Sequence, residues 1–188
     1  MKKKKITCGV GIIECLDKDD PGSEGRCLEH VFNLMEIDSA YSHVDSIDDL
    51  LRSIAESEFQ YVHISAHGAT GGKQDRFKGW WTPKGIGTKA KVAQLIGNVK
   101  ATAIISTACK SGTQGFGRYI VNELGCQYFI GPTGSPKFYN ASLFAHIFYH
   151  KLFRSKGGVP SAFRSYENIN ISNNPHHFTL YDRATKYK

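Results

Sequence analysis

The sequence Tyr61-Val-His-Ile-Ser-Ala-His67-Gly68 carries the clearest structural signal in the chain. Apolar residues dominate its first five positions, which is typical of a parallel strand buried on both faces. A second stretch, Ala103-Ile-Ile-Ser-Thr-Ala-Cys109-Lys-Ser-Gly112, has the same form. In both, an apolar strand leads through alanine into a histidine or a cysteine, and a glycine follows soon after. The 42 residues from His67 to Cys109 suit a loop, a helix and a return strand within one sheet.

Strand and helix patterns alternate along the rest of the chain. Short apolar or alternating runs predict further strands at 6–12, 40–44, 127–130 and 178–181. Apolar residues at helical spacing predict helices that start near 23, 46 and 88 and others over 116–124, 143–152 and 159–169. The glycine-rich segment 68–87 is predicted to be a loop. This alternation with short connections predicts an α/β fold, a three-layer α/β/α sandwich with a mostly parallel central sheet.

Length and composition fit one globular domain over 1–188 with a basic tail at 1–5. Hydrophobic residues make up 40% of the chain and charged residues 22%, which excludes a mainly disordered protein. No apolar run reaches the length of a membrane span, so no membrane partner is expected. The formal net charge is +7, but residues 2–5 supply four of these charges. The rest of the chain has no basic stripe, so nucleic acid is not an expected partner.

The five cysteines are Cys8, Cys15, Cys27, Cys109 and Cys126, and no two of them form a C-x-x-C pair. An odd number without such a pair argues against a disulfide scaffold and against a cysteine-rich zinc site. We therefore expect the protein to work in a reducing, cytoplasmic compartment.

Three further patterns are interpreted as structural. The first sixteen residues resemble a signal peptide, but Glu14 interrupts the apolar stretch and no cleavage site follows, so we interpret them as a lysine tail before the first strand. His146 and His150 have the spacing of a zinc-binding pair, but Ile147 stands where a metalloprotease has glutamate. No metal site is predicted. His63 is interpreted as a residue that packs the sheet.

The two strand ends offer the groups that thiol catalysis needs. A cysteine thiol is only slightly ionised at neutral pH, and a neighbouring imidazole can take its proton. The backbone N–H groups of Gly68 and Cys109 could form an oxyanion hole, since glycine leaves a substrate carbonyl free to approach. The alternative interpretation is structural: Cys109 is a small buried apolar residue and His67 ends a strand.

The two stretches resemble the signature blocks of caspase-like cysteine peptidases, most closely the CHAT branch that is related to separases. That branch has an apolar strand ending in His-Gly and another ending in Ser-Ala-Cys-x-Ser-Gly. The similarity continues in the helix at 116–124, in Tyr128-Phe-Ile-Gly-Pro132 and in the apolar helix over 140–152, and it covers roughly residues 58–168. It implies a caspase–haemoglobinase fold.

The resemblance also implies roles for single residues. Cys109 is then the nucleophile of a cysteine endopeptidase, His67 the general base and acid, and Gly68 with Cys109 the oxyanion hole. Such an enzyme cleaves a protein substrate through a thioester and needs no metal or organic cofactor. The same comparison suggests a bacterial protease of regulation or antiviral defence. Because free proteolysis in the cytoplasm is harmful, we expect this protease to be latent and to be activated by a partner protein or a small-molecule ligand. The rival interpretation is a catalytically silent scaffold or binding module with this fold.

The substrate pocket is predicted at the same strand ends. Its candidate residues are Ser65, Thr107, Trp80 and Trp81, although the two tryptophans could be ordinary packing. Relatives that cut after arginine or lysine often place an aspartate two positions before the nucleophile, where this chain has Thr107. We therefore expect a neutral or small polar residue before the cleaved bond. A basic preference would require an acid from a loop, and the candidates are Asp45 and Asp75.

Overall fold

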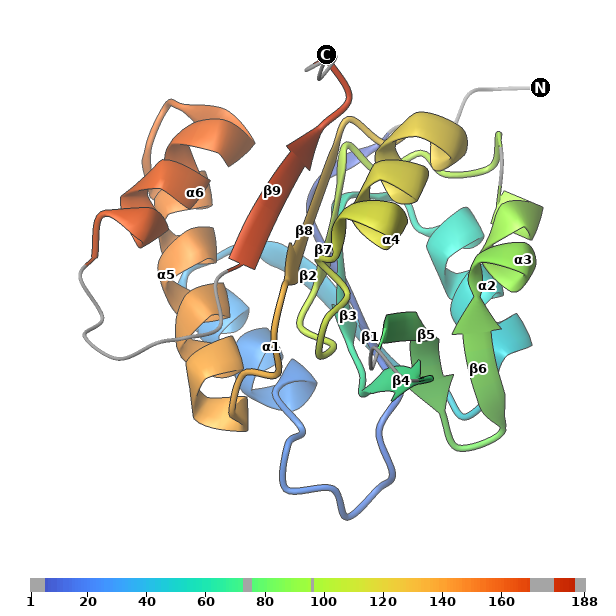
Figure 1. Ribbon diagram of the computed structural model, residues 1–188. Coiled ribbons are helices and arrows are strands. Elements are labelled where there is room, and N and C mark those ends of the chain that lie inside the picture. The colour runs from blue at the N-terminus through green and yellow to red at the C-terminus, as the bar shows by residue number, and fades with distance from the viewer. Residues whose placement is uncertain (1–5, 73–75, 96, 170–177, 185–188) are drawn as a thin grey trace, which may run out of the picture.

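A six-stranded sheet forms the middle layer of the molecule (Figure 1). Its strands are β1 (Thr7–Glu14), β2 (Asp38–His43), β3 (Phe59–Ser65), β7 (Ala103–Ser106), β8 (Tyr128–Pro132) and β9 (Phe178–Asp182). They lie in the order β2-β1-β3-β7-β8-β9, and all pair in parallel except β9, which is antiparallel to β8. The computed structural model describes residues 6–72, 76–95, 97–169 and 178–184. The predicted tail at 1–5 lies outside them.

Helices cover both faces of this sheet, as Figure 1 shows. One face carries α1 (Gly25–Leu34), α5 (Phe138–Arg154) and α6 (Gly158–Glu167). The other carries α2 (Ile47–Glu56), α3 (Lys89–Val92) and α4 (Gln114–Tyr119). The turn Ala93–Leu95 continues α3 as a 3₁₀ helix, and Ile120–Leu124 continues α4 as a π-helix. This arrangement confirms the predicted three-layer α/β/α sandwich with a mostly parallel sheet.

Local sequence explains where the helices begin and end. The Ser46 side chain accepts the N–H of Asp49 at 3.2 Å and so caps α2, whose first turn also holds two acidic residues that favour the positive end of the helix dipole. The π-helix after α4 ends at Gly125, which has a φ of +86°. Glycine adopts this left-handed conformation at little cost and is therefore common just after the end of a helix.

Burial on both faces explains the apolar strands. In β3, Val62 and Ile64 point into the core beneath α2 and α4, while Tyr61 and His63 point toward α1 and α5. All four residues of β7 are buried. The strands predicted at 61–65 and 103–106 are therefore central strands, and they pair directly with each other.

The predicted loop at 68–87 is wrong. This segment forms a second, antiparallel sheet of β4 (Gly68–Gly71), β5 (Arg76–Thr82) and β6 (Gly85–Thr88). The many glycines of this segment suggested turns, but a glycine within a strand often marks a place where two backbones approach closely. A Cβ atom added at Gly79 would lie 2.2 Å from the carbonyl oxygen of Gly87 on the neighbouring strand.

The helices of the described residues are all too short or too polar to cross a lipid bilayer.

Candidate active site

The register of β3 and β7 brings His67 and Cys109 to the same level of one sheet edge. Ile64 pairs with Ser106, and each of the two candidates lies three residues beyond its member of this pair. Parallel strands end at a common edge, which is the usual position of ligand and active sites in such sheets. Both side chains line one pocket at this edge. The sequence prediction that the two strand ends meet is thus confirmed.

Gly68 packs directly on the backbone of Cys109. A Cβ atom at Gly68 would lie 1.9 Å from the carbonyl oxygen of Cys109 and 3.1 Å from its nitrogen. Any other residue would push the turn that carries the thiol away from His67. The structure therefore explains the glycine by its contact with the backbone of Cys109, while the oxyanion role of the two N–H groups stays a prediction.

The turn after Cys109 is held tightly from the other side. Lys110 has a φ of +62°, a conformation that side-chain-bearing residues rarely adopt. Its N–H donates to the carbonyl of Gly134 at 2.7 Å, and the N–H of Gly112 donates to the carbonyl of Pro132 at 2.8 Å. Strain of this kind is typical of functional sites, where the surrounding structure holds it in place.

His67 is oriented by an aspartate that the sequence analysis did not identify. Its Nε2 lies 2.7 Å from Oδ2 of Asp20, in the loop between β1 and α1. The other carboxylate oxygen of Asp20 accepts the N–H of Gly22 at 2.7 Å, so the carboxylate is fixed before it meets the histidine. Because Nε2 is taken, Nδ1 is the ring nitrogen left to exchange a proton with a thiol.

The pocket beside Cys109 is small. Its volume of about 20 Å³ is close to what one water molecule needs. Phe138, at the start of α5, lines it and is 47% exposed. The Phe138 ring lies 5.9 Å from the ring of His67, and a Cβ atom at Gly22 would come within 2.1 Å of it. Phe138 and Gly22 together leave little open space above His67 and Cys109.

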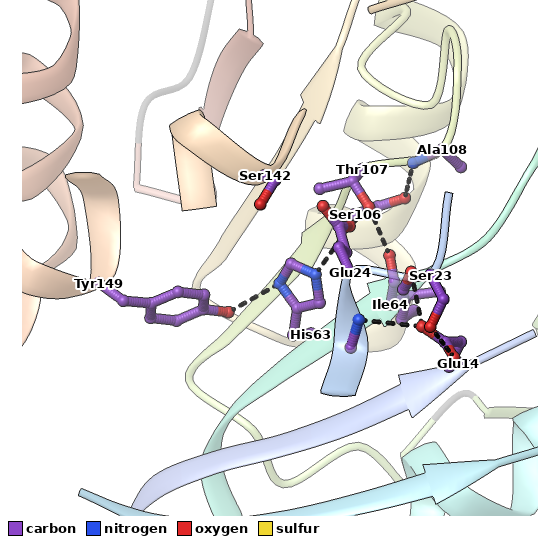
Figure 2. A network of polar contacts seen from close by, with 12 residues as sticks. Glu14, Ser23, Glu24, His63, Ile64, Ser106, Thr107, Ala108, Ser142 and Tyr149 are labelled. Carbon is purple, nitrogen blue, oxygen red and sulfur yellow. Dashed lines mark hydrogen bonds and ion pairs between the residues drawn. The ribbon is translucent and has the colours of Figure 1, made fainter. Parts of the chain in front are cut away.

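A network of buried polar side chains, shown in Figure 2, shares Glu24 and Thr107 with the pocket lining. Its centre is Glu24, the residue before α1, which is 6% exposed and lines the same pocket as Cys109. One carboxylate oxygen accepts hydrogen bonds from Thr107 and from Nε2 of His63 at 3.2 Å. The other oxygen, Oε2, has no hydrogen-bond partner within the described chain.

A second buried carboxylate, Glu14, ends β1 at the same edge. It is 3% exposed and accepts four hydrogen bonds, from Ser23, Tyr41 and Ser65 and from the backbone N–H of Gly25. Both oxygens of the Glu14 carboxylate therefore have hydrogen-bond donors.

His63 links this network to α5. Its Nδ1 lies 3.1 Å from the hydroxyl of Tyr149. Burial raises the pKa of Tyr149 well above 10, so this hydroxyl keeps its proton beside Nδ1. The prediction that His63 packs inside the sheet is confirmed by its complete burial, although its contacts are polar.

The four predicted pocket residues do not all lie at the site. Ser65 and Thr107 line the pocket, and the ring of Trp81 lies 5.8 Å from the ring of His67. Trp80 is a correction: it is 0% exposed, and its indole N–H donates to Ser106 at 3.0 Å inside the core. Side chains alternate along a strand, so β5 can direct only one of its two tryptophans toward the site.

The two aspartates named for a basic pocket do not supply one. Asp45 lies at the surface, 3.5 Å from His43 and 3.6 Å from Lys84, and it does not line the pocket. Asp75 lies outside the described residues. The acid that does line the pocket is Glu24. The expectation of a neutral residue before the cleaved bond assumed a pocket without a carboxylate, and this assumption is wrong.

The functional residues missed from sequence were acids with no motif. Glu14 was noticed only because it interrupts an apolar strand, yet a charged residue at the carboxyl end of a buried strand is itself a signal for a site. Asp20 and Glu24 stand in a polar loop and before a helix, where acids are common. Cys27 of α1 lies 3.9 Å from His146 of α5, and the described residues hold no group of three or more candidate metal ligands.

Neither a known protein-family profile nor a curated protein sequence matches this chain.

Proposed function

We propose that the protein is a cysteine endopeptidase in which Cys109 is the nucleophile and His67 the general base and acid. The observation that carries this proposal is the single pocket lined by both residues, with the imidazole fixed at Nε2 by Asp20. The arrangement of nucleophile, base and orienting acid is the one that activates a weak nucleophile in acyl-transfer enzymes. The resemblance to caspase-like peptidases points the same way.

The reaction follows from these groups. Nδ1 of His67 takes the thiol proton as sulfur attacks the carbonyl carbon of the substrate. The resulting oxyanion is bound by the N–H groups of Gly68 and Cys109. The imidazolium then gives its proton to the leaving amine, which leaves a thioester on Cys109. Water, deprotonated by His67, hydrolyses the thioester and restores the thiol, with Asp20 stabilising the transient imidazolium.

Latency is part of the proposal. A pocket of about 20 Å³ under Phe138 cannot hold a substrate side chain, so the residues above the catalytic pair must move before turnover. A partner protein or a small-molecule ligand would supply this movement. We further propose a bacterial regulatory or antiviral-defence role and a cytoplasmic location. All five cysteines are free thiols, which fits a reducing compartment.

The test is covalent labelling of Cys109 by a substrate-like electrophile, for example a short peptide that ends in an acyloxymethyl ketone. We expect one adduct in the intact mass, lost in Cys109→Ala and in His67→Ala. Cys27→Ala is the matched control, because Cys27 is an exposed thiol beside a histidine and should not be needed. Labelling that moves to Cys27 or Cys8, or that persists without His67, would contradict the dyad.

The closed pocket also favours a second candidate, the catalytically silent scaffold. A scaffold would keep the same fold and never open the space beside Cys109. In that case Cys109 would react with the peptide electrophile no faster than the exposed Cys8 does, even in Phe138→Ala, which removes the ring above the pocket. A rate for Cys109 at least tenfold above that of Cys8 would exclude the scaffold.

A further inference from the structure

The unpaired oxygen of Glu24 is the most unusual polar group in the described part of the molecule. A buried carboxylate normally has donors for both oxygens, because leaving one unpaired in a low-dielectric site is costly. Glu14 has four donors and shows that this edge of the fold can satisfy a carboxylate. Glu24 has donors on one oxygen only, and Oε2 is left without a partner within the described chain.

Among the described residues, no lysine or arginine forms an ion pair with Glu24. Within the described ranges, neither Glu14 nor Glu24 has an ion pair with a lysine or an arginine, and the only charge-capable neighbour of Glu24 is His63. The Glu24 carboxylate therefore lines the pocket without a lysine or arginine partner from the described residues.

We propose that this pocket accepts a lysine or arginine side chain from the residue that precedes the cleaved bond, with Glu24 as its charge partner. The inference rests on the proposed peptidase function. Glu24 lines the pocket together with Cys109, so a cation held at Oε2 positions the following carbonyl near the sulfur. A guanidinium or ammonium group would give Oε2 the donor it lacks and offset the negative charge.

The other walls suit the stem of such a side chain. Leu16, Ala66 and Ala141 line the pocket and offer apolar contact to methylene groups. The present volume is too small for a guanidinium, so Phe138 must rotate away from Gly22 as the side chain enters. Its ring is half exposed, and the rotation would not break the buried network.

The experiment compares peptide ketones that differ only in the side chain next to the reactive group: arginine, its neutral isostere citrulline, and lysine against norleucine. The rate of Cys109 labelling is followed by intact mass. We expect each cationic probe to label the wild-type protein at least tenfold faster than its neutral counterpart. In Glu24→Gln the ratio should fall to within about twofold of one, with labelling by citrulline unchanged or faster.

The variant Glu24→Gln tests the negative charge of this side chain separately from its hydrogen bonds. Glutamine keeps a carbonyl oxygen for Thr107 and His63, so the network survives while the negative charge is lost. Glu29→Gln, within α1 but outside the pocket lining, is the matched control and should keep the wild-type ratio. Phe138→Ala should speed labelling by all four probes and preserve the preference for cations.

The outcomes separate the two proposals. Labelling of Cys109 with equal rates for charged and neutral probes overturns the pocket inference alone. Absence of labelling by every probe, also in Phe138→Ala, overturns the peptidase proposal. In that case, calorimetry with agmatine, a small guanidinium compound, tests whether the pocket binds a cation. Binding to the wild type that is lost in Glu24→Gln supports the cation pocket, and equal or absent binding overturns it.

Discussion

Asp20 gives His67 a fixed tautomer. Its Oδ1 is bound by the N–H of Gly22, and its Oδ2 therefore faces Nε2 of the imidazole. A carboxylate at this position keeps the ring proton on Nε2 and leaves Nδ1 as the acceptor for the thiol proton. In the Ser-His-Asp triad, the acid has the same orienting role.

We predict that Asp20→Asn slows the labelling of Cys109 roughly 10- to 1000-fold without unfolding the protein. The amide oxygen will keep the bond from Gly22, so the amide NH₂ will face Nε2 and force the ring proton onto Nδ1. Nitrogen-15 NMR of His67 should report this change of tautomer. Asp19→Asn, an exposed neighbour in the same loop, should leave both the rate and the spectrum as in the wild type. A wild-type rate in Asp20→Asn would remove Asp20 from the mechanism.

At the scale of elements, Trp80 of β5 is a main anchor of the small sheet β4-β5-β6, beside Phe77 of the same strand, whose ring lies 4.7 Å from that of Phe116. Trp80 is fully buried, its ring lies edge-on to Phe116 at 5.1 Å, and its indole N–H is bonded to Ser106 in the central sheet. Phe116 belongs to α4, the helix that follows the nucleophile turn. The tryptophan thus ties the small sheet, the central sheet and α4 into one core.

We predict that Trp80→Ala lowers the free energy of unfolding by about 3–5 kcal/mol, because it leaves a large cavity and an unpaired Ser106 hydroxyl. Trp81→Ala is the matched control on the next residue of β5. Its side chain is only partly buried, so the loss of stability should be clearly smaller, whereas labelling of Cys109 should change through its contact with His67. Urea denaturation measures the first effect. Equal losses in the two variants would show that Trp80 is not a main anchor.

At the scale of the whole molecule, neutral buried groups on both faces of the sheet set the behaviour at high pH. Burial raises the pKa of Cys126 from 9.0 to about 12, and it raises the pKa of Cys15 and of Tyr149 as well. Cys15 and Cys126 belong to one core layer and Tyr149 to the other. Each keeps its proton in the folded state at a pH where the unfolded chain has released it.

We predict that the free energy of unfolding falls as pH rises above about 9. Between 9.0 and about 12 the unfolded chain binds fewer protons than the folded one at Cys126, so this residue alone lowers stability by up to about 1.4 kcal/mol per pH unit. Below pH 9 both states are protonated at this thiol, and it has no effect. Urea titrations from pH 7 to 11 should give a shallower decline for Cys126→Ala than for the wild type. Cys8→Ala, at an exposed thiol, should keep the wild-type slope.

The sequence alone was enough for the central sheet and its covering helices. Apolar strands, the Ser46 cap and the glycine at 125 act within a few residues of themselves, and such local signals can be recognised without a structure. The two strand ends with His67 and Cys109 were predicted for the same reason, since each ends an apolar strand.

Tertiary structure alone brought the acids to the site. Asp20 meets His67 across 47 residues and Glu24 meets Thr107 across 83, and neither pair leaves a local pattern in the chain. Their approach depends on the register of β1, β3 and β7, which lie side by side and deliver three loops to one edge. The sheet at 68–87 escaped prediction for a related reason, because its glycines are explained by backbone contacts between strands that only the folded chain forms.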